Sequence, residues 1–162
     1  MDIEFRSVLD SAMGRFVISS SEKGITSIRL SAEEIEENES HHTFLCRSEL
    51  LDYLDGRLEA FTVNIDTSNH TSFHQRVWNQ LIKIPYGKTV SYMHIANALD
   101  NPKAIRAVGR ANGLNPIPFI IPCHRVIGSD GSLTGYAMGV EMKAKLLNME
   151  NPMAYPLQQR LF

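Results

Sequence analysis

Cysteine is scarce in this sequence, because only Cys46 and Cys123 occur among 162 residues. Two cysteines are too few for a disulfide framework or a cysteine-rich zinc site, so we expect a reducing, cytoplasmic compartment. No run of about 18 apolar residues exists, which predicts no membrane-spanning segment. The first ten residues, MDIEFRSVLD, lack a basic start and an apolar stretch, so they predict no secretory signal.

The composition is that of an ordinary globular protein. Hydrophobic residues make up 43% and charged residues 21%, with ten glycines and seven prolines. These values exclude collagen-like, disordered and coiled-coil proteins. A chain of about 150 residues can bury roughly two thirds of its unfolded surface, which suffices for one domain or two small ones.

Charge is divided unevenly along the chain. Residues 1–70 hold six Lys and Arg against fourteen Asp and Glu, whereas residues 71–145 hold nine basic residues against three acidic ones. A basic part beside an acidic part suggests an anionic partner, with nucleic acid as the first candidate. The alternative is that the basic residues are scattered over a solvated face, and charge alone leaves both possibilities open.

The first part of the chain has the pattern of a small α/β unit. Short alternating segments bounded by turn residues predict strands at residues 5–11, 14–20 and 24–31. The acidic stretch 32–42 lacks apolar periodicity and predicts a loop or the fringe of a helix. Apolar residues near helical spacing within 44–61 predict a helix with an inward stripe of Phe44, Leu45, Leu50, Leu51, Leu54 and Leu58. Residues 62–67 alternate like an edge strand, and we place a domain boundary near residue 68.

The second part is predominantly helical. Residues 73–84 predict a helix with a stripe of Phe73, Val77, Trp78, Leu81 and Ile84. Further helices are expected over 92–99, capped by Thr89 or Ser91, over 103–111, and over 140–150 with Met142, Leu146 and Leu147 inward. A helix, a polar turn and a second helix with Arg106 and Arg110 form the outline of a helix-turn-helix, which ordinary helical hairpins share.

The chemistry-bearing feature is Cys123, which is followed at once by His124 and Arg125. A thiolate is the reactive form of cysteine, and cationic neighbours or a helix start lower the pKa of a thiol. Pro122 favours a helix start, so this stretch could supply both effects. A nearby base would take the proton and a carboxylate, with Glu150 as candidate, would orient that base. Because adjacent side chains on a helix do not face each other, we expect His124 to act through a water.

These residues alone favour a plainer explanation, since most free cysteines are small buried apolar residues. Two other classes also stay open. One is a DNA-binding protein without catalysis, either a repressor or a lesion reader without a nucleophile. The other is a cysteine hydrolase, which would need a catalytic histidine distant in sequence and an oxyanion site, and neither stands out.

The residues around Cys123, taken over a longer stretch of the chain, favour a reactive cysteine over a plain buried one. The run Pro122-Cys123-His124-Arg125-Val126 resembles the active-site motif of the O6-alkylguanine-DNA alkyltransferases, the methylated-DNA–protein-cysteine methyltransferases. The likeness extends, in order and with family-like spacing, over residues 73–92, 106–128, 131–136 and 143–150. Residues 1–68 are compatible with the variable N-terminal domain of that family.

The resemblance implies a fold and a reaction. Residues 1–68 would form an α/β, ribonuclease-H-like domain, and residues 69–162 a mainly α domain with a winged-helix-like helix-turn-helix. The activity would be that of a methylated-DNA–protein-cysteine S-methyltransferase. Cys123 would take the alkyl group from O6 of a guanine that is flipped out of double-stranded DNA, and we expect the same transfer from O4 of thymine. The resulting thioether is not readily hydrolysed, so each molecule acts once, as a monomer and without a cofactor.

The resemblance also implies roles for single residues. His124, through water, and Glu150 would activate the thiol of Cys123. Asn115 would brace the turn between the recognition helix and the active site. Tyr92 would assist nucleotide rotation and donate a proton or hydrogen bond to the leaving guanine. Each residue has an ordinary alternative role, as a core-edge aromatic, a turn residue or a helix-end carboxylate.

DNA contacts are implied for the helix over 103–111. Arg106 would fill the space vacated in the duplex, and Ala107 would let the helix lie close to the minor groove, with Arg110 as a further contact. Without the resemblance, Arg106 would be taken for a solvated charge. The base pocket would be formed by Val126, Tyr136, Ala137 and Met138.

Two departures from the family pattern affect these expectations. Many relatives have a small or basic residue and then glycine after the tyrosine, whereas this chain has Ala137-Met138, so we hypothesise that Met138 narrows the pocket mouth against bulky O6 substituents. Some relatives bind zinc in the N-terminal domain, but Cys46, His41 and His42 match such a site poorly. We therefore expect no metal and a half-buried Cys46.

Overall fold

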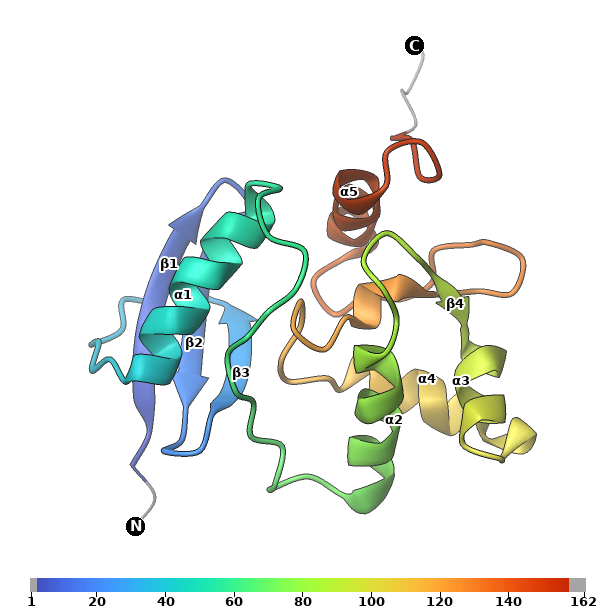
Figure 1. Ribbon diagram of the computed structural model, residues 1–162, viewed down its shortest axis with the longest axis horizontal. Helices are drawn as coiled ribbons and strands as arrows, with labels where there is room; N and C mark the ends of the chain where they lie inside the picture. The colour runs from blue at the N-terminus through green and yellow to red at the C-terminus, as the bar shows by residue number, and fades with distance from the viewer. Residues whose placement is uncertain (1–2, 158–162) are drawn as a thin grey trace. The chain divides into compact units, whose positions relative to one another are not determined.

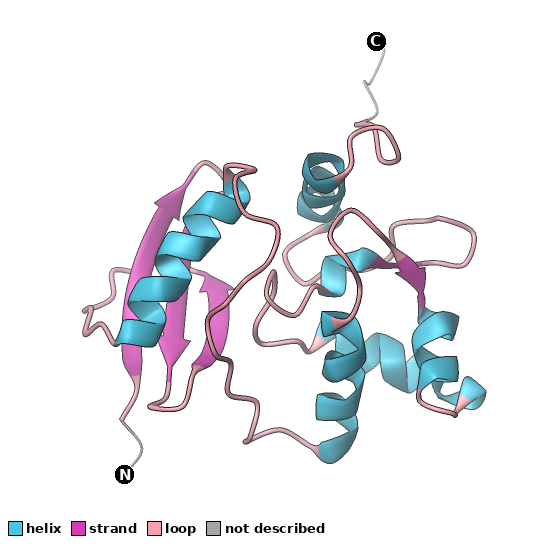
Figure 2. Cartoon of the chain, viewed as in Figure 1, coloured by secondary structure: helices cyan, strands magenta, loops and turns pink. Residues whose placement is uncertain are grey.

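The computed structural model describes residues 3–157 of the chain. The chain divides into two compact units, one formed by residues 1–75 with 116–121 and the other by residues 76–115 with 122–162. The first contains a three-stranded sheet with one helix, and the second is mainly helical (Figure 2). Within the described residues no helix is long and apolar enough to cross a membrane. The sequence pattern did not indicate that segment 116–121 belongs to the first unit.

The sheet of the first unit confirms the strands predicted from the sequence to within one residue at each end. It comprises β1 (Phe5–Ser11), β2 (Gly14–Ser20) and β3 (Ile25–Leu30), antiparallel with β2 in the centre. β2 is buried from Phe16 to Ser20, as its central place requires. In the turn before β3, a Cβ on Gly24 would lie 2.7 Å from the carbonyl oxygen of Asn64, so only glycine allows this approach.

α1 (His41–Leu54) covers one face of this sheet (Figure 1). It begins at the N-cap Ser40 in a capping box with Thr43, slightly before the predicted start. The hydroxyl of Ser7 donates to that of Thr43 over 2.8 Å, which turns Thr43 toward the sheet. The predicted apolar stripe is therefore correct at Leu50, which is fully buried, and wrong at the residues that face solvent, because these polar contacts help to orient the helix. The apolar residues left exposed on α1 are Phe44, Leu45 and Leu51.

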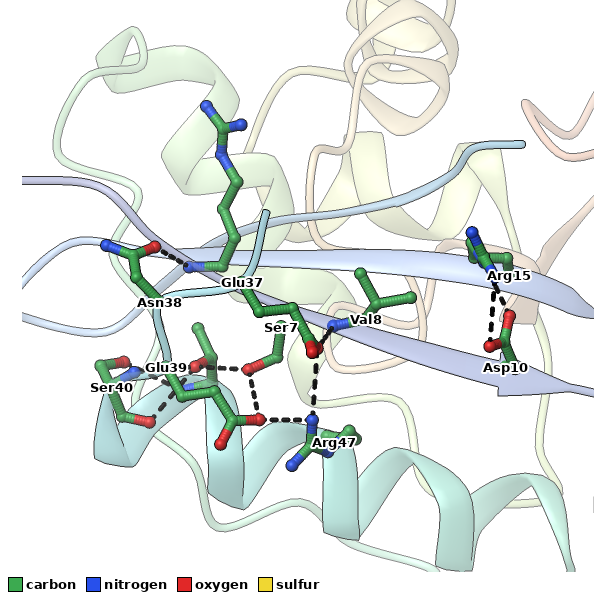
Figure 3. Close-up of polar contacts among 11 residues, drawn as sticks. Ser7, Val8, Asp10, Arg15, Glu37, Asn38, Glu39, Ser40 and Arg47 are labelled. Atoms are coloured by element: carbon green, nitrogen blue, oxygen red, sulfur yellow. Dashed lines mark hydrogen bonds and ion pairs between the residues drawn. The ribbon is translucent and has the colours of Figure 1, made fainter. Parts of the chain in front are cut away.

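The acidic segment 31–40 is irregular, as expected for a loop, apart from one bridge to β1. Its side chains nevertheless bind the neighbouring elements (Figure 3). Glu37 accepts a hydrogen bond from the backbone N–H of Val8 over 2.7 Å. Glu39 accepts one from the Ser7 hydroxyl over 3.1 Å and forms an ion pair with Arg47 of α1. The acidic residues thus fasten the segment to the sheet and the helix.

Residues 62–67 do not form the predicted strand. They make a single parallel bridge, between Ile65 and Ile25. The cause lies in Glu49 of α1, whose buried carboxylate accepts hydrogen bonds from the backbone N–H groups of Thr62 and Val63, each at 2.9 Å to Oε1. Because a side chain takes these donors, they are not available to a strand partner.

Segment 116–121 completes the core of the first unit. The N–H of Ile28 in β3 donates to the carbonyl of Pro116 over 2.9 Å. The buried Phe119 ring packs edge-on against Phe16, with ring centres 5.4 Å apart, and lies 6.1 Å from the ring of Tyr53. Phe119 has a φ of 73°, a strained value for an aromatic residue, which this packing offsets.

The second unit confirms the predicted helices. They are α2 (Ser72–Ile82), whose residues 72–75 still belong to the first unit, α3 (Tyr92–Ala98), α4 (Ile105–Gly113) and α5 (Val140–Glu150). A 3-10 turn, η1 (Pro102–Ala104), leads into α4. Of the two predicted capping residues, Ser91 and not Thr89 is the N-cap of α3. The indole N–H of Trp78 donates to the carbonyl of Ala111 over 2.9 Å and joins α2 to the end of α4.

A short parallel pairing in the second unit was not anticipated. β4 (Val90–Ser91) pairs with β5 (Val126–Ile127), so that Val90 lies opposite Val126 and Ser91 opposite Ile127. α3 follows directly on β4, and β5 follows directly on the turn that contains Cys123. This ladder therefore brings the start of α3 next to the segment with the candidate nucleophile.

Candidate active site

Cys123 opens a 3-10 turn of three residues, η2 (Cys123–Arg125), immediately after Pro122. Its exposed fraction is 6%, so the residue is nearly enclosed. The buried side of α4 also faces this turn, because the amide of Asn112 donates to the carbonyl of Cys123 over 3.4 Å. The helix predicted over 103–111 ends later in the structure, where α4 continues through Gly113.

Glu150, the last residue of α5, lies next to His124 as the sequence analysis anticipated. Its Oε2 is 2.7 Å from Nε2 of His124, and both side chains are fully buried. The backbone N–H of Gly87 donates to Oε1 over 3.1 Å. The carboxylate is therefore in place to orient the imidazole.

Arg125 provides the countercharge of Glu150, a contact that the sequence analysis missed. Its Nε donates to Oε1 over 2.9 Å and its Nη2 to Oε2 over 3.0 Å, a bidentate pair. The remaining terminal nitrogen donates to the carbonyl of Ile84 over 2.7 Å, and the guanidinium lies over the ring of Tyr86. A buried glutamate requires a cation nearby, and this requirement, applied to Glu150, is the signal that could have pointed to Arg125.

His124 is a neutral base in this environment. Burial lowers the pKa of the imidazole, and the hydrogen bond and charge of Glu150 oppose that effect. A neutral imidazole that donates Nε2–H to a carboxylate carries its basic lone pair on Nδ1. His124 can therefore accept a proton at Nδ1 while Glu150 stabilises the imidazolium that forms.

Burial raises the pKa of the Cys123 thiol to about 11, although the side chain of Asn115 and the charge of Lys143 act in the opposite direction. The prediction of a lowered pKa is therefore wrong for the free protein. The helix start is only one 3-10 turn, Arg125 is directed at Glu150, and His124 is neutral, so these groups do not offset desolvation. The thiol is protonated at neutral pH and must lose its proton to react.

Lys143 is a fully buried lysine of α5 that the sequence analysis did not single out. Its ammonium donates to the carbonyl of Val126 over 2.6 Å and to that of Thr134 over 3.0 Å. Burial lowers the pKa of Lys143 to about 8, and the charge of the Cys123 thiolate opposes this. Its spacing from Leu146 and Leu147 places Lys143 on their helix face, and this signal could have revealed it.

The other expected site residues differ in their contacts and in how far they are buried. The hydroxyl of Tyr92, at the start of α3, accepts a hydrogen bond from the Thr134 hydroxyl over 3.1 Å. Tyr136 is buried, and within residues 3–157 its hydroxyl has no hydrogen-bond partner. Burial raises the pKa of Tyr136, and the charge of Cys123 raises it further. Next to it, Ala137 is exposed and Met138 half-buried.

The expected DNA-contacting residues lie on the solvent face of α4. Arg106, Ala107 and Arg110 are exposed, while Val108 and Ala111 face the core. Seven of the nine basic residues within 71–145 are exposed. The two others, Arg125 and Lys143, are buried and belong to the cluster around Cys123. The positive surface is accordingly smaller than the sequence indicated.

Cys46 is fully buried in α1, not half-buried as predicted. Burial raises the pKa of its thiol to about 12. In the part of the chain from residue 3 to 157, no group of three or more His, Cys, Asp or Glu side chains is arranged to hold a metal ion.

Two family models match the chain. The DNA-binding domain of 6-O-methylguanine DNA methyltransferase matches residues 72–152, and the ribonuclease-like domain of the same family matches residues 5–67. The fold and these matches thus define a methyltransferase with a small N-terminal sheet domain and a helical C-terminal domain.

Individual relatives agree with this class. A methylated-DNA–protein-cysteine methyltransferase of Mycobacterium bovis is 41% identical over 166 residues, covering 99% of both chains. The inducible enzyme of that name from Bacillus subtilis is 52% identical over 102 residues, 63% of this chain and 56% of the relative. The Mycobacterium tuberculosis O6-methylguanine methyltransferase structure has a TM-score of 0.82 at 38% identity, covering 93% of this chain and 94% of that one. This chain belongs to the 6-O-methylguanine DNA methyltransferase family.

A further structural neighbour was solved with DNA bound. The structure of Mycobacterium tuberculosis OGT in complex with DNA has a TM-score of 0.81 at 39% identity, covering 90% of this chain and 91% of that one. A structure from Pyrococcus kodakaraensis, at 19% identity and a TM-score of 0.54, shares the fold.

Proposed function

We propose that this protein repairs duplex DNA by transferring the alkyl group from O6 of an alkylated guanine to Sγ of Cys123. A sulfur–carbon bond forms and the carbon–O6 bond breaks. The thiol proton passes through a water to Nδ1 of His124, and guanine gains a proton from the hydroxyl of Tyr92, so that charge and protons balance. The thioether ends the reaction, which makes the protein stoichiometric and independent of a cofactor.

Activation of the thiol is supported by the electrostatics of the second unit. Since the pKa of Cys123 is raised to about 11, transfer at neutral pH requires a base. His124 is neutral and held by Glu150 at 2.7 Å, which leaves Nδ1 for that task. A hydrogen bond from the side chain of Asn115 acts to lower the pKa of Cys123, and Asn115 would hold the thiol toward the substrate.

DNA engagement follows from the position of the target atom. Guanine O6 is unreachable inside a stacked duplex, so the nucleotide must rotate out at a cost of roughly a few kcal/mol. In the proposal, α3 and α4 act as the helix-turn-helix of a winged-helix-like domain, Arg106 fills the vacated stack, and Ala107 and Arg110 face the groove. In the same proposal, the first unit corresponds to the family's ribonuclease-H-like domain.

The flipped base would occupy a pocket formed by Val126, Tyr136, Ala137 and Met138. The half-buried Met138 would narrow its mouth and disfavour bulky O6 substituents. The same pocket would admit O4-alkylthymine, which presents its alkyl carbon at an equivalent edge. The partner is double-stranded DNA with an alkylated base, bound by a monomer.

The observation that carries the proposal is the buried Cys123 thiol beside the His124–Glu150 pair, in a chain of this family. The test is intact-protein mass spectrometry after incubation with an O6-methylguanine duplex under reducing conditions, with an unmodified duplex as reference. One methyl group, mapped to Cys123, is expected. The Cys123→Ala variant should bind DNA and remain unmodified, whereas Cys46→Ala should be methylated. Binding without modification, or turnover of an ester or peptide, would replace the proposal with a lesion reader or a hydrolase.

The role of Arg106 is tested separately. Arg106→Ala should weaken DNA binding and nucleotide rotation, which a fluorescent base analogue beside the lesion reports. Arg76→Ala is the matched control, since it removes an exposed positive charge from the same unit. If both variants bind and rotate the nucleotide equally well, Arg106 acts only through its charge.

A further inference from the structure

Thr134 lies in the loop between β5 and α5 and makes two contacts that the proposed roles do not use. Its hydroxyl donates to the hydroxyl oxygen of Tyr92 over 3.1 Å. Its carbonyl accepts from the ammonium of Lys143 over 3.0 Å. One residue thus connects the tyrosine at the start of α3 with the buried lysine of α5.

We infer that Thr134 is a positioning residue for alkyl transfer, which orients the hydroxyl of Tyr92 so that its proton faces the leaving guanine. The inference rests on the proposed function. Because Thr134 is the donor in this hydrogen bond, the proton of Tyr92 is not used in it and stays available. A hydroxyl that accepts a hydrogen bond also becomes a stronger donor, since chains of hydrogen bonds polarise one another.

The loop at Thr134 is held firmly enough for this task. The Lys143 ammonium that binds the Thr134 carbonyl also binds the carbonyl of Val126, over 2.6 Å. Val126 in turn pairs with Val90 of β4, two residues before Tyr92. The contacts therefore close a circuit from β4 through Tyr92, Thr134, Lys143 and β5 back to β4. Such a closed set of contacts fixes the geometry on which a proton transfer depends.

The ring of Tyr92 is constrained from a second side. A Cβ at Gly109 of α4 would lie 3.9 Å from the ring, so the ring rests against this part of the helix. With the ring placed by α4 and the hydroxyl by Thr134, rotation about the phenol carbon–oxygen bond remains as the main freedom. The hydrogen bond from Thr134 limits that rotation.

The effect belongs to the transfer step and not to DNA binding. The contact between Thr134 and Tyr92 is exposed in the free protein, where water competes with it. A bound duplex would exclude that water, and the hydrogen bond then contributes more. Removal of the Thr134 hydroxyl is therefore expected to slow transfer in the bound complex and to leave the affinity for DNA unchanged.

The test compares single-turnover methyl transfer at saturating O6-methylguanine duplex. Thr134→Val keeps the side-chain shape and removes the hydroxyl, and it should slow transfer about 3- to 10-fold, as expected for one neutral hydrogen bond. Thr134→Ser should restore the parental rate. Thr89→Val is the matched control, because it breaks a similar pair, between the hydroxyls of Thr89 and Tyr155 at 2.6 Å in the same unit, and its rate should be parental.

A double-variant cycle shows whether Thr134 acts through Tyr92. In the Tyr92→Phe background, Thr134→Val should cause no further loss of rate, because the oxygen that it orients is absent. Additive losses, a parental rate for Thr134→Val, or a loss confined to DNA affinity would each overturn the inference while the proposed function stands. Absence of methylation in the parent protein would instead overturn the proposed function and the inference with it.

Discussion

Replacing Glu150 with glutamine tests the structural cost of the buried cluster. The carboxylate accepts hydrogen bonds from His124 at 2.7 Å, from two nitrogens of Arg125 at 2.9 and 3.0 Å, and from the backbone of Gly87 at 3.1 Å. Glutamine keeps the size of the side chain, removes its charge and turns an amide N–H₂ toward one of these donors. The perturbation is therefore electrostatic and not steric.

The magnitude follows from the state of Arg125 in the variant. The side chains of Arg125 and Glu150 are 8% and 0% exposed, so the guanidinium loses its countercharge inside the protein. Removal of one partner of a buried ion pair costs about 3–5 kcal/mol. Arg125 keeps its hydrogen bond to Ile84 and its position over the Tyr86 ring, so we expect the lower end, about 3 kcal/mol. The double variant Arg125→Met/Glu150→Gln should recover much of this loss, because no unpaired charge remains.

Urea unfolding followed by fluorescence measures the effect in the relevant unit, because Trp78 is the only tryptophan and lies in the second unit. Glu141→Gln is the control on the same helix. Its side chain is 88% exposed, so its free energy of unfolding should change by less than about 0.5 kcal/mol. A loss below about 1 kcal/mol for Glu150→Gln, or a double variant no more stable than the single one, would refute the assignment of a buried, charge-compensated pair.

Three further outcomes are expected. Because burial raises the pKa of Cys123 to about 11, iodoacetamide should modify this thiol about 100-fold more slowly at pH 7 than an unperturbed thiol of pKa about 9. The modification rate should keep rising toward pH 11, and a plateau near pH 8 would contradict the raised pKa. Glu49→Gln should speed hydrogen exchange of the amides of Thr62 and Val63, and unchanged protection, measured by NMR, would remove the role given to that carboxylate. Met138→Gly should be inactivated faster than the parent by a benzylguanine-type pseudosubstrate. Equal rates would refute the hypothesis that Met138 narrows the mouth of the base pocket.

Local patterns predicted most secondary structure correctly and failed where side chains competed with them. The three strands of the first unit and the helices of the second follow from alternation, helical spacing and caps. The stripe of α1 was wrong in part because the hydrogen bond from Ser7 to Thr43 helps to orient the helix, and the strand over 62–67 was wrong because Glu49 binds its N–H groups. In both cases the deciding contact joins residues that are distant in sequence.

Residue order alone singled out the candidate thiol, imidazole and carboxylate, since the Cys123-His124 run and its likeness to one family depend on nothing else. The tertiary structure alone decided their electrostatic state. It directed Arg125 at Glu150, buried Lys143 beside the carbonyls of β5 and the following loop, and raised the pKa of the Cys123 thiol. The physical reason is that desolvation and charge pairing depend on what surrounds a group in space, which adjacency along the chain does not define.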